Sequence, residues 1–256
     1  MAVPTISIDA LTERDIAKTI DHSLLRPELD DAFIEDGCRL AAEYDVASVC
    51  MRPVDVRRAA AILAGTDVAV GTTIGFPHGG HATATKVDEA RRALADGARE
   101  LDMVIQIGAL KSGRDGDVQA DIAAVVEVAH AAGAIVKVIF ENAYLTDDEK
   151  VRACRLSEAA GADFVKTSTG FAPSGATHDD LRLMRANTSP HIGVKAAGGV
   201  RTLDGLLEVI ALGVTRIGAT QTKAIIDDFR ARKAGAAPVG ASAGTSGGGA
   251  SAAGGY

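Results

Sequence analysis

The sequence lacks several features that mark particular classes of protein. It has no Trp and only six Phe, and its cysteines (Cys38, Cys50 and Cys154) are far apart, with no C-x-x-C motif. We therefore expect neither a zinc ribbon nor a disulfide framework, and free thiols suit a reducing compartment. No basic run alternates with aromatics, and the net charge is -7. This charge balance disfavours binding to nucleic acid.

Long apolar stretches are absent as well. No segment approaches about 18 consecutive apolar residues, so we expect no membrane span. The first residues, MAVPTISIDALTERD, have neither the basic start nor the apolar core of a signal peptide. Together these absences predict a cytoplasmic protein without a membrane partner.

The sequence does contain a regular alternation of short apolar segments and amphipathic segments. A helix is predicted over 9–19, with Thr12 as its N-cap and Asp15 three residues later. Eight predicted strands follow, each succeeded by a helix, and Gly ends several of the helices. The strands start at Ile20 and continue at 45–51, 68–76, 100–105, 135–141, 164–168, 191–198 and 215–219. The helices cover 31–44, 54–64, 82–97, 117–132, 146–160, 178–186, 203–212 and 221–233.

This alternation predicts an α/β protein with one (β/α)8 TIM barrel over 1–233, preceded by an extra N-terminal helix. A doubly wound sheet is the alternative, but no G-x-G-x-x-G follows the first strand. Residues 234–256 are almost entirely Gly, Ala and Ser without a charged side chain. Such a composition predicts a flexible, disordered tail, which ends in Tyr256.

Several predicted strands carry charges that buried barrel strands normally avoid. These residues are Asp102, Lys137, Glu141, Lys166 and Lys195. Strand alternation would turn all five into the barrel, near the C-terminal mouth where barrel enzymes keep their chemistry.

Two interpretations of these charges stay open at this point. They form either a buried ion network that cancels internally or a site in which Lys166 is a nucleophile. A second cation near Lys166 would lower its pKa and supply free amine, which favours a Schiff-base site for carbonyl substrates.

Glycine-bearing turns follow the last two predicted strands, at 196–202 and 217–220. Gly198 and Gly199 allow the backbone to approach an anion, and Arg201 adds charge. Gly170, after the Lys166 strand, could join them. Loops in these positions commonly bind phosphate in barrels, so we expect a phosphate site.

Three histidines, His22, His78 and His81, follow the first and third strands and could in principle bind zinc for a metal-dependent aldolase or hydrolase. The loop GFPHGGH is rich in glycine, however, and no set of carboxylates accompanies it. We expect no metal and no other cofactor. Cys50 is expected to line the pocket as a neutral thiol.

The segments KTSTGF, VKAAGGVRT, LDMVI, IGFPHG and IDHSLLRP together resemble deoxyribose-phosphate aldolase over nearly the whole chain. The resemblance implies a metal-free class I aldolase that reversibly cleaves 2-deoxy-D-ribose 5-phosphate to D-glyceraldehyde 3-phosphate and acetaldehyde. It implies that Lys166 forms the Schiff base, that Lys195 lowers the pKa of Lys166, and that Asp102 relays protons.

The resemblance also implies which residues bind substrate. Asp21 and Ser23 would hold hydroxyls or waters, and Cys50 and Thr167 would line the pocket. The phosphate would be held by Gly170, Gly198, Gly199, Arg201, Gly218 and Ala219. Relatives can end in a tyrosine that assists proton transfer, which Tyr256 matches. Ser23, Gln106 and Thr220 depart from the commonest family pattern, which has Thr, Asn and Ser there.

The expected partners are phosphorylated sugar and aldehyde substrates, with a possible homodimer. Two other readings stay open: a phosphate-binding barrel isomerase, and a non-catalytic sugar-phosphate sensor.

Overall fold

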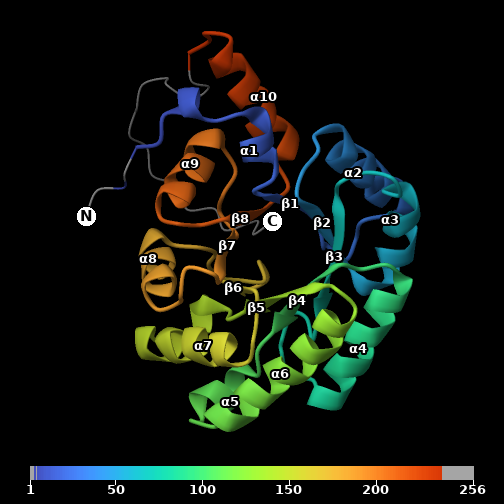
Figure 1. Ribbon diagram of the computed structural model, residues 1–256, viewed down its shortest axis with the longest axis vertical. Coiled ribbons are helices and arrows are strands. Elements are labelled where there is room, and N and C mark those ends of the chain that lie inside the picture. The colour runs from blue at the N-terminus through green and yellow to red at the C-terminus, as the bar shows by residue number, and fades with distance from the viewer. Residues whose placement is uncertain (1–2, 4, 238–256) are drawn as a thin grey trace.

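A computed structural model describes residue 3 and residues 5–237. Eight parallel strands close into a barrel in chain order, and helices surround it (Figure 1). The strands are β1 (Ile20–Leu24), β2 (Ser48–Met51), β3 (Ala69–Ile74), β4 (Glu100–Val104), β5 (Ile135–Ile139), β6 (Phe164–Lys166), β7 (Gly193–Ala197) and β8 (Arg216–Ala219). The predicted TIM barrel is confirmed, and the doubly wound alternative is excluded.

The helices lie where the amphipathic segments predicted them, with two differences. They are α1 (Glu13–Ala17), α2 (Asp31–Glu43), α3 (Val56–Ile62), α4 (Thr83–Asp96), α5 (Ile107–Lys111), α6 (Asp115–Ala131), α7 (Asp147–Ala159), α8 (His178–Ala186), α9 (Leu203–Ala211) and α10 (Thr222–Lys233). The segment predicted as one helix over 9–19 is a 3-10 turn, Ile8–Ala10, followed by α1. The short helix α5, between β4 and α6, was not predicted.

Local sequence signals account for where the helices begin and end. Thr12 and Asp15 form the capping box of α1, and Thr146 forms another with Glu149 at α7. Gly97 ends α4 with φ 115°, a conformation that side chains with a Cβ rarely adopt. The predicted cap at Thr12 is therefore confirmed.

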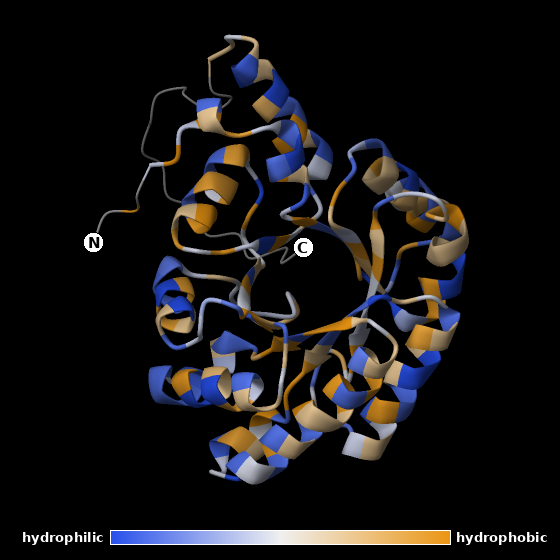
Figure 2. Ribbon diagram, viewed as in Figure 1, coloured by the Kyte–Doolittle hydropathy of each residue, from blue (hydrophilic) through white to orange (hydrophobic). Residues whose placement is uncertain are grey.

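Each helix packs an apolar stripe against the barrel. In α2 the buried positions are Ile34, Gly37, Cys38 and Ala41, which is the spacing of one helix face. A Cβ at Gly37 would lie 2.6 Å from Leu24 Cδ2, so glycine allows α2 to approach β1 closely. Figure 2 shows that apolar and hydrophilic residues both occur around these helices, as expected for a layer between core and solvent.

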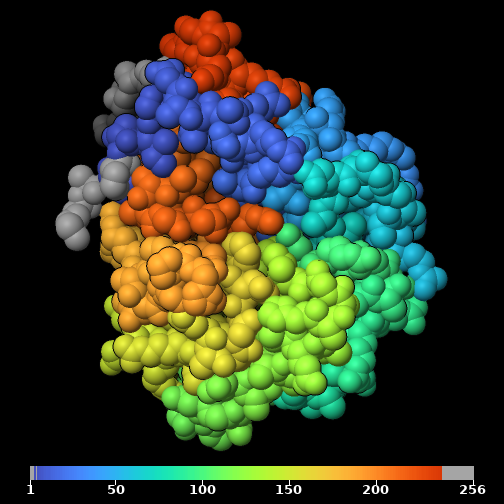
Figure 3. All heavy atoms as spheres, viewed as in Figure 1, coloured from blue at the N-terminus to red at the C-terminus, as the bar shows by residue number. Residues whose placement is uncertain are grey.

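The first and last helices close the outer ring. Figure 3 shows the N-terminal segment in blue lying against α10 in red. Arg230 of α10 pairs with Glu13 of α1 at 2.6 Å. No described helix is long and apolar enough to cross a membrane. From residue 238 onward, the predicted tail lies outside the described residues.

Candidate active site

Charged side chains occupy several interior positions of the barrel, where bulky branched residues are usual. The register aligns Asp21 with Gly218, Asp102 with Lys137 and Lys166 with Lys195. Because aligned residues of parallel strands face the same way, these side chains share the interior. The predicted inward orientation of Lys137, Lys166, Lys195 and Asp102 is confirmed.

An aromatic ring closes the bottom of this interior. A Cβ at Gly193 would lie 2.2 Å from Phe164 Cε1, so the glycine leaves the space that the Phe164 ring occupies. The guanidinium of Arg216 lies 5.8 Å from the centre of the same ring. This packing places Arg216 below the lysines.

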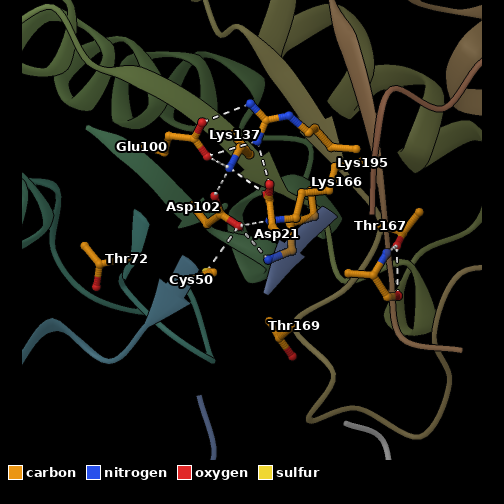
Figure 4. Close-up of polar contacts among 12 residues, drawn as sticks. Asp21, Cys50, Thr72, Glu100, Asp102, Lys137, Lys166, Thr167, Thr169 and Lys195 are labelled. Carbon is orange, nitrogen blue, oxygen red and sulfur yellow. Dashed lines mark hydrogen bonds and ion pairs between the residues drawn. The ribbon is translucent and has the colours of Figure 1, made fainter. Parts of the chain in front are cut away.

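Asp102 lies at the centre of the site (Figure 4). Its Oδ2 accepts hydrogen bonds from Lys166 Nζ and Lys195 Nζ, each at 2.7 Å. Its Oδ1 lies 3.2 Å from Lys137 Nζ but accepts no hydrogen bond from the described residues. All four side chains are at least 98% buried. One carboxylate therefore bridges two lysines and keeps one oxygen available to a further donor.

A second set of ion pairs lies beneath Asp102. Asp21 Oδ2 is 2.5 Å from Lys195 Nζ and 2.8 Å from Lys137 Nζ, and its Oδ1 pairs with Arg216. Glu100 pairs with both Lys137 and Arg216. The carboxylate of Asp21 is fully buried and pairs with three cations, so its charge attracts the ammonium groups of Lys195 and Lys137 by direct contact.

The network contains four cationic side chains and three carboxylates. Lys137 contacts three of the carboxylates and Lys195 contacts two, whereas Lys166 contacts Asp102 alone among the described carboxylates. Loss of one proton makes the network neutral.

The pKa of Lys166 differs from the sequence-based expectation. Burial lowers it, but the Asp102 carboxylate more than offsets burial, and the pKa lies above its ordinary value. The prediction that a neighbouring cation leaves Lys166 with a lowered pKa is wrong. The reason is that Asp102 lies between the two lysines and attracts both protons.

Burial would raise the pKa of Asp102, but Lys137, Lys166 and Lys195 hold it well below its usual range. Burial and the nearby Asp102 charge raise the pKa of Cys50 to about 11. The Cys50 thiol is thus neutral near pH 7, as predicted, and lies 3.7 Å from Asp102 Oδ2.

Glu141 does not join the central network, contrary to the sequence-based expectation. Strand β5 ends at Ile139, and Glu141 follows it with φ 58°, so strand alternation no longer sets its direction. Its carboxylate is hydrogen-bonded to Thr169 instead.

The other predicted substrate residues surround the lysines from β1, β6 and β8. A Cβ at Gly218 would lie 3.7 Å from Ser23 Oγ and 3.7 Å from Lys195 Cε, which places Ser23 beside Lys195. Ala219 is buried at the end of β8. Thr167 points away from the network in Figure 4 and bonds both backbone groups of Ala197, so it ties β6 to β7.

The loop that carries Gly170 contacts the predicted phosphate turn after β7. Gly170, Gly198 and Gly199 have φ of 89°, 77° and 105°. The amide of Ala176 donates to the carbonyls of Ala197 and Gly198 at 3.0 Å, which joins the β6–α8 loop to the turn after β7. Arg201 is exposed and directly precedes Thr202, the N-cap of α9.

The three histidines do not form one cluster. His22 is buried and its Nδ1 lies 2.9 Å from Thr222 Oγ1 of α10, whereas His78 and His81 are exposed at a cavity of about 410 Å³ near α4 and α5. Among residues 3 and 5–237, no group of three or more His, Cys, Asp or Glu is arranged to hold a metal ion.

The sequence analysis missed Glu100 and Arg216. Both occupy the first position of their strands, two residues before Asp102 and Gly218. The same alternation that turned Asp102 inward would have identified Glu100. Tyr256 lies outside the described residues.

A closed β/α barrel with ionisable groups inside its C-terminal half is the architecture of a barrel enzyme. The sequence matches the DeoC/LacD family aldolase description over residues 16–246. The chain belongs to this family and is an aldolase, a type of lyase.

Individual proteins support the same assignment. A deoxyribose-phosphate aldolase of Rhodopirellula baltica is 52% identical over 216 residues, covering 84% of this chain and 90% of that protein. One of Lysinibacillus sphaericus is 50% identical over 84% of this chain and 96% of that protein. The tetrameric deoxyribose phosphate aldolase structure from Aeropyrum pernix has a TM-score of 0.81 at 29% identity, covering 88% and 95% of the two chains.

Proposed function

We propose that the chain cleaves 2-deoxy-D-ribose 5-phosphate reversibly to D-glyceraldehyde 3-phosphate and acetaldehyde through a Schiff base on Lys166. The observation that carries the proposal is the bridge from Asp102 Oδ2 to Lys166 and Lys195, each at 2.7 Å. A purely structural ion network would have no need for a cation in excess of its carboxylates.

The reaction starts when Lys166 has lost its proton and its Nζ adds to the aldehyde carbon of the open-chain sugar. The resulting carbinolamine loses its hydroxyl as water, with a proton delivered through Asp102, and an iminium forms. Asp102 Oδ1 accepts no hydrogen bond from the described residues, so it can accept one from the departing hydroxyl or from a water beside it.

Carbon–carbon cleavage then uses the iminium as an electron sink. A base removes the proton of the C3 hydroxyl, the C2–C3 bond breaks, and its electron pair forms the enamine of acetaldehyde on Lys166. D-glyceraldehyde 3-phosphate leaves, the enamine gains a proton at carbon, and water hydrolyses the iminium to release acetaldehyde. We propose that Ser23 and Asp21 order the waters and hydroxyls involved.

The phosphate is proposed to bind Gly170, Gly198, Gly199, Arg201, Gly218 and Ala219. The first three of these glycines have a positive φ, which residues with a side chain rarely adopt. A Cβ at Gly198 would lie only 2.9 Å from Gly175 Cα. Backbone N–H groups in such turns, beside the start of α9, favour an anion.

Covalent trapping tests the function. Borohydride added with substrate is expected to fix an adduct on Lys166, and Lys166→Met is expected to give none. An isomerase or a sugar-phosphate sensor would bind the phosphate without any adduct, so an untrapped but phosphate-binding wild type refutes the aldolase reading.

Three further predictions stand with this function. Tyr256 is proposed to assist proton transfer at the donor carbon, and its deletion is expected to slow proton exchange on acetaldehyde. Unchanged exchange would refute that role. The homodimer and the cytoplasmic location stay predictions.

A further inference from the structure

Glu141 has an uncommon backbone conformation for a residue with a side chain. Its φ of 58° and ψ of 66° lie in the left-handed region, and among the described non-glycine residues only Asp45 shares a positive φ. This conformation is unfavourable for L-residues and persists where the surroundings impose it. Asp45 lies at a helix end on the surface side of the fold, whereas Glu141 lies at the mouth of the barrel and is 98% buried.

The carboxylate of Glu141 binds the segment that follows the catalytic strand. Both of its oxygens accept from the backbone N–H of Thr169 at 3.3 Å, and Oε2 accepts a short hydrogen bond from the Thr169 hydroxyl. The Thr169 Oγ1 in turn accepts from the backbone N–H of Phe171 at 3.0 Å. One carboxylate thus fixes three consecutive residues, 169 to 171, with Gly170 in the middle.

Lys166 itself is held in a different way. Its carbonyl accepts from Phe140 N at 3.0 Å, and the carbonyl of Thr167 accepts from Asn142 N at 2.9 Å. These bonds use only backbone atoms, so they do not depend on which side chain occupies position 141. In Figure 4 Thr169 lies on the loop beyond the ion-pair network, apart from Lys166 and Asp102.

We propose that Glu141 is a positioning residue that fixes residues 169–171 relative to Lys166 and so sets the distance between the nucleophile and the phosphate of the substrate. The proposal deepens the proposed function and rests on it for its kinetic consequences. The strained backbone at 141 is what points the carboxylate across to Thr169, because an extended residue following Phe140 would direct its side chain elsewhere.

The chain offers a variant that removes the carboxylate without adding strain. Glycine adopts φ 58° readily, so Glu141→Gly keeps the backbone favourable while it frees Thr169. Glu141→Gln is the matched control, because its amide oxygen still accepts from Thr169. Thr169→Val removes the hydroxyl from the other partner.

Kinetics with and without the phosphate separate this role from a general structural one. In Glu141→Gly, KM for 2-deoxyribose 5-phosphate is expected to rise about tenfold, the change that corresponds to losing one hydrogen bond to a charged group. We expect kcat to be nearly unchanged, and KM for unphosphorylated 2-deoxyribose as well. Thr169→Val should raise the same KM, and its effect should not add to that of Glu141→Gly. Glu141→Gln should resemble the wild type.

Amide hydrogen exchange supplies a readout that does not require turnover. Exchange at Thr169 and Phe171 is expected to accelerate in Glu141→Gly and to stay slow in Glu141→Gln. Unchanged exchange in Glu141→Gly, or an equal rise of KM for both sugars, overturns the positioning role. A wild type that does not cleave the phosphorylated sugar refutes the proposed function instead, and the exchange result still decides the role of Glu141.

Discussion

Replacing Lys195 by methionine isolates the electrostatic effect of one ammonium group on another. Lys166 Nζ and Lys195 Nζ each lie 2.7 Å from Asp102 Oδ2, so the two nitrogens are at most about 5.4 Å apart. At an effective dielectric constant of about 20, two unit charges at that distance repel by about 3 kcal/mol. The Lys195 charge therefore favours the neutral amine of Lys166 by this amount.

In Lys195→Met the pKa of Lys166 is expected to rise further above its ordinary value, because Asp102 then serves Lys166 without competition. The population of neutral amine near pH 7 should fall on the order of 100-fold, since each 1.4 kcal/mol is a factor of ten. The rate of borohydride-trapped adduct formation with acetaldehyde should fall by the same factor. It should also level off at a higher pH than in the wild type.

The control is Lys195→Arg, which keeps the positive charge. Its pH profile is expected to stay in place even where the absolute rate changes. Circular dichroism during heating checks that both variants are folded. If Lys195→Met lowers the rate but leaves the pH profile in place, Lys195 does not act through the electrostatic effect of its charge on Lys166.

Three further predictions concern other charged or buried groups. Asp102→Asn removes the anion that raises the pKa of Lys166, so the pH profile of adduct formation should move to lower pH while kcat falls. A profile displaced to higher pH would contradict the conclusion that Asp102 raises this pKa. Lys86 and Asp121 form a buried ion pair at 2.5 Å outside the barrel. Lys86→Ala should lower the free energy of unfolding, measured in urea, by about 3–5 kcal/mol because it leaves the buried Asp121 charge without its cation. The double variant Lys86→Met with Asp121→Leu should recover most of this loss. Burial lowers the pKa of His22 from 6.5 to about 4, so between these pH values the unfolded state binds a proton that the folded state does not. The free energy of unfolding should therefore fall by about 3 kcal/mol as the pH drops from 6.5 to 4. Denaturant unfolding of His22→Asn at the two pH values should show that this part of the pH dependence is lost.

The barrel could be read from local patterns because its units are short and repetitive. Each apolar segment was long enough for one strand, and several helices carried caps that the sequence shows, as at Thr12, Thr146 and Gly97. The ends of the strands were predicted less exactly than the strands themselves. The strand expected over 164–168 ends at Lys166, because Thr167 and Ser168 already belong to the loop.

The site was only partly predictable, since alternation tells which face a residue occupies but not what it meets. It placed Asp102, Lys137, Lys166 and Lys195 together correctly. It did not predict that Asp102 would lie between the two lysines, and so the direction of the Lys166 pKa was wrong. It also assumed that Glu141 would continue the strand, whereas the chain turns there with a positive φ.

The sequence alone determined which residues within the strands face the interior, because the two-residue period of a strand is a local property. The tertiary structure decided which charges touch and how many carboxylates each lysine contacts. Those contacts join residues up to 195 positions apart, as between Arg216 and Asp21. Coulomb energies change steeply over a few ångströms, so the proton affinity of Lys166 depends on the closed barrel and cannot be derived from a local segment of the sequence.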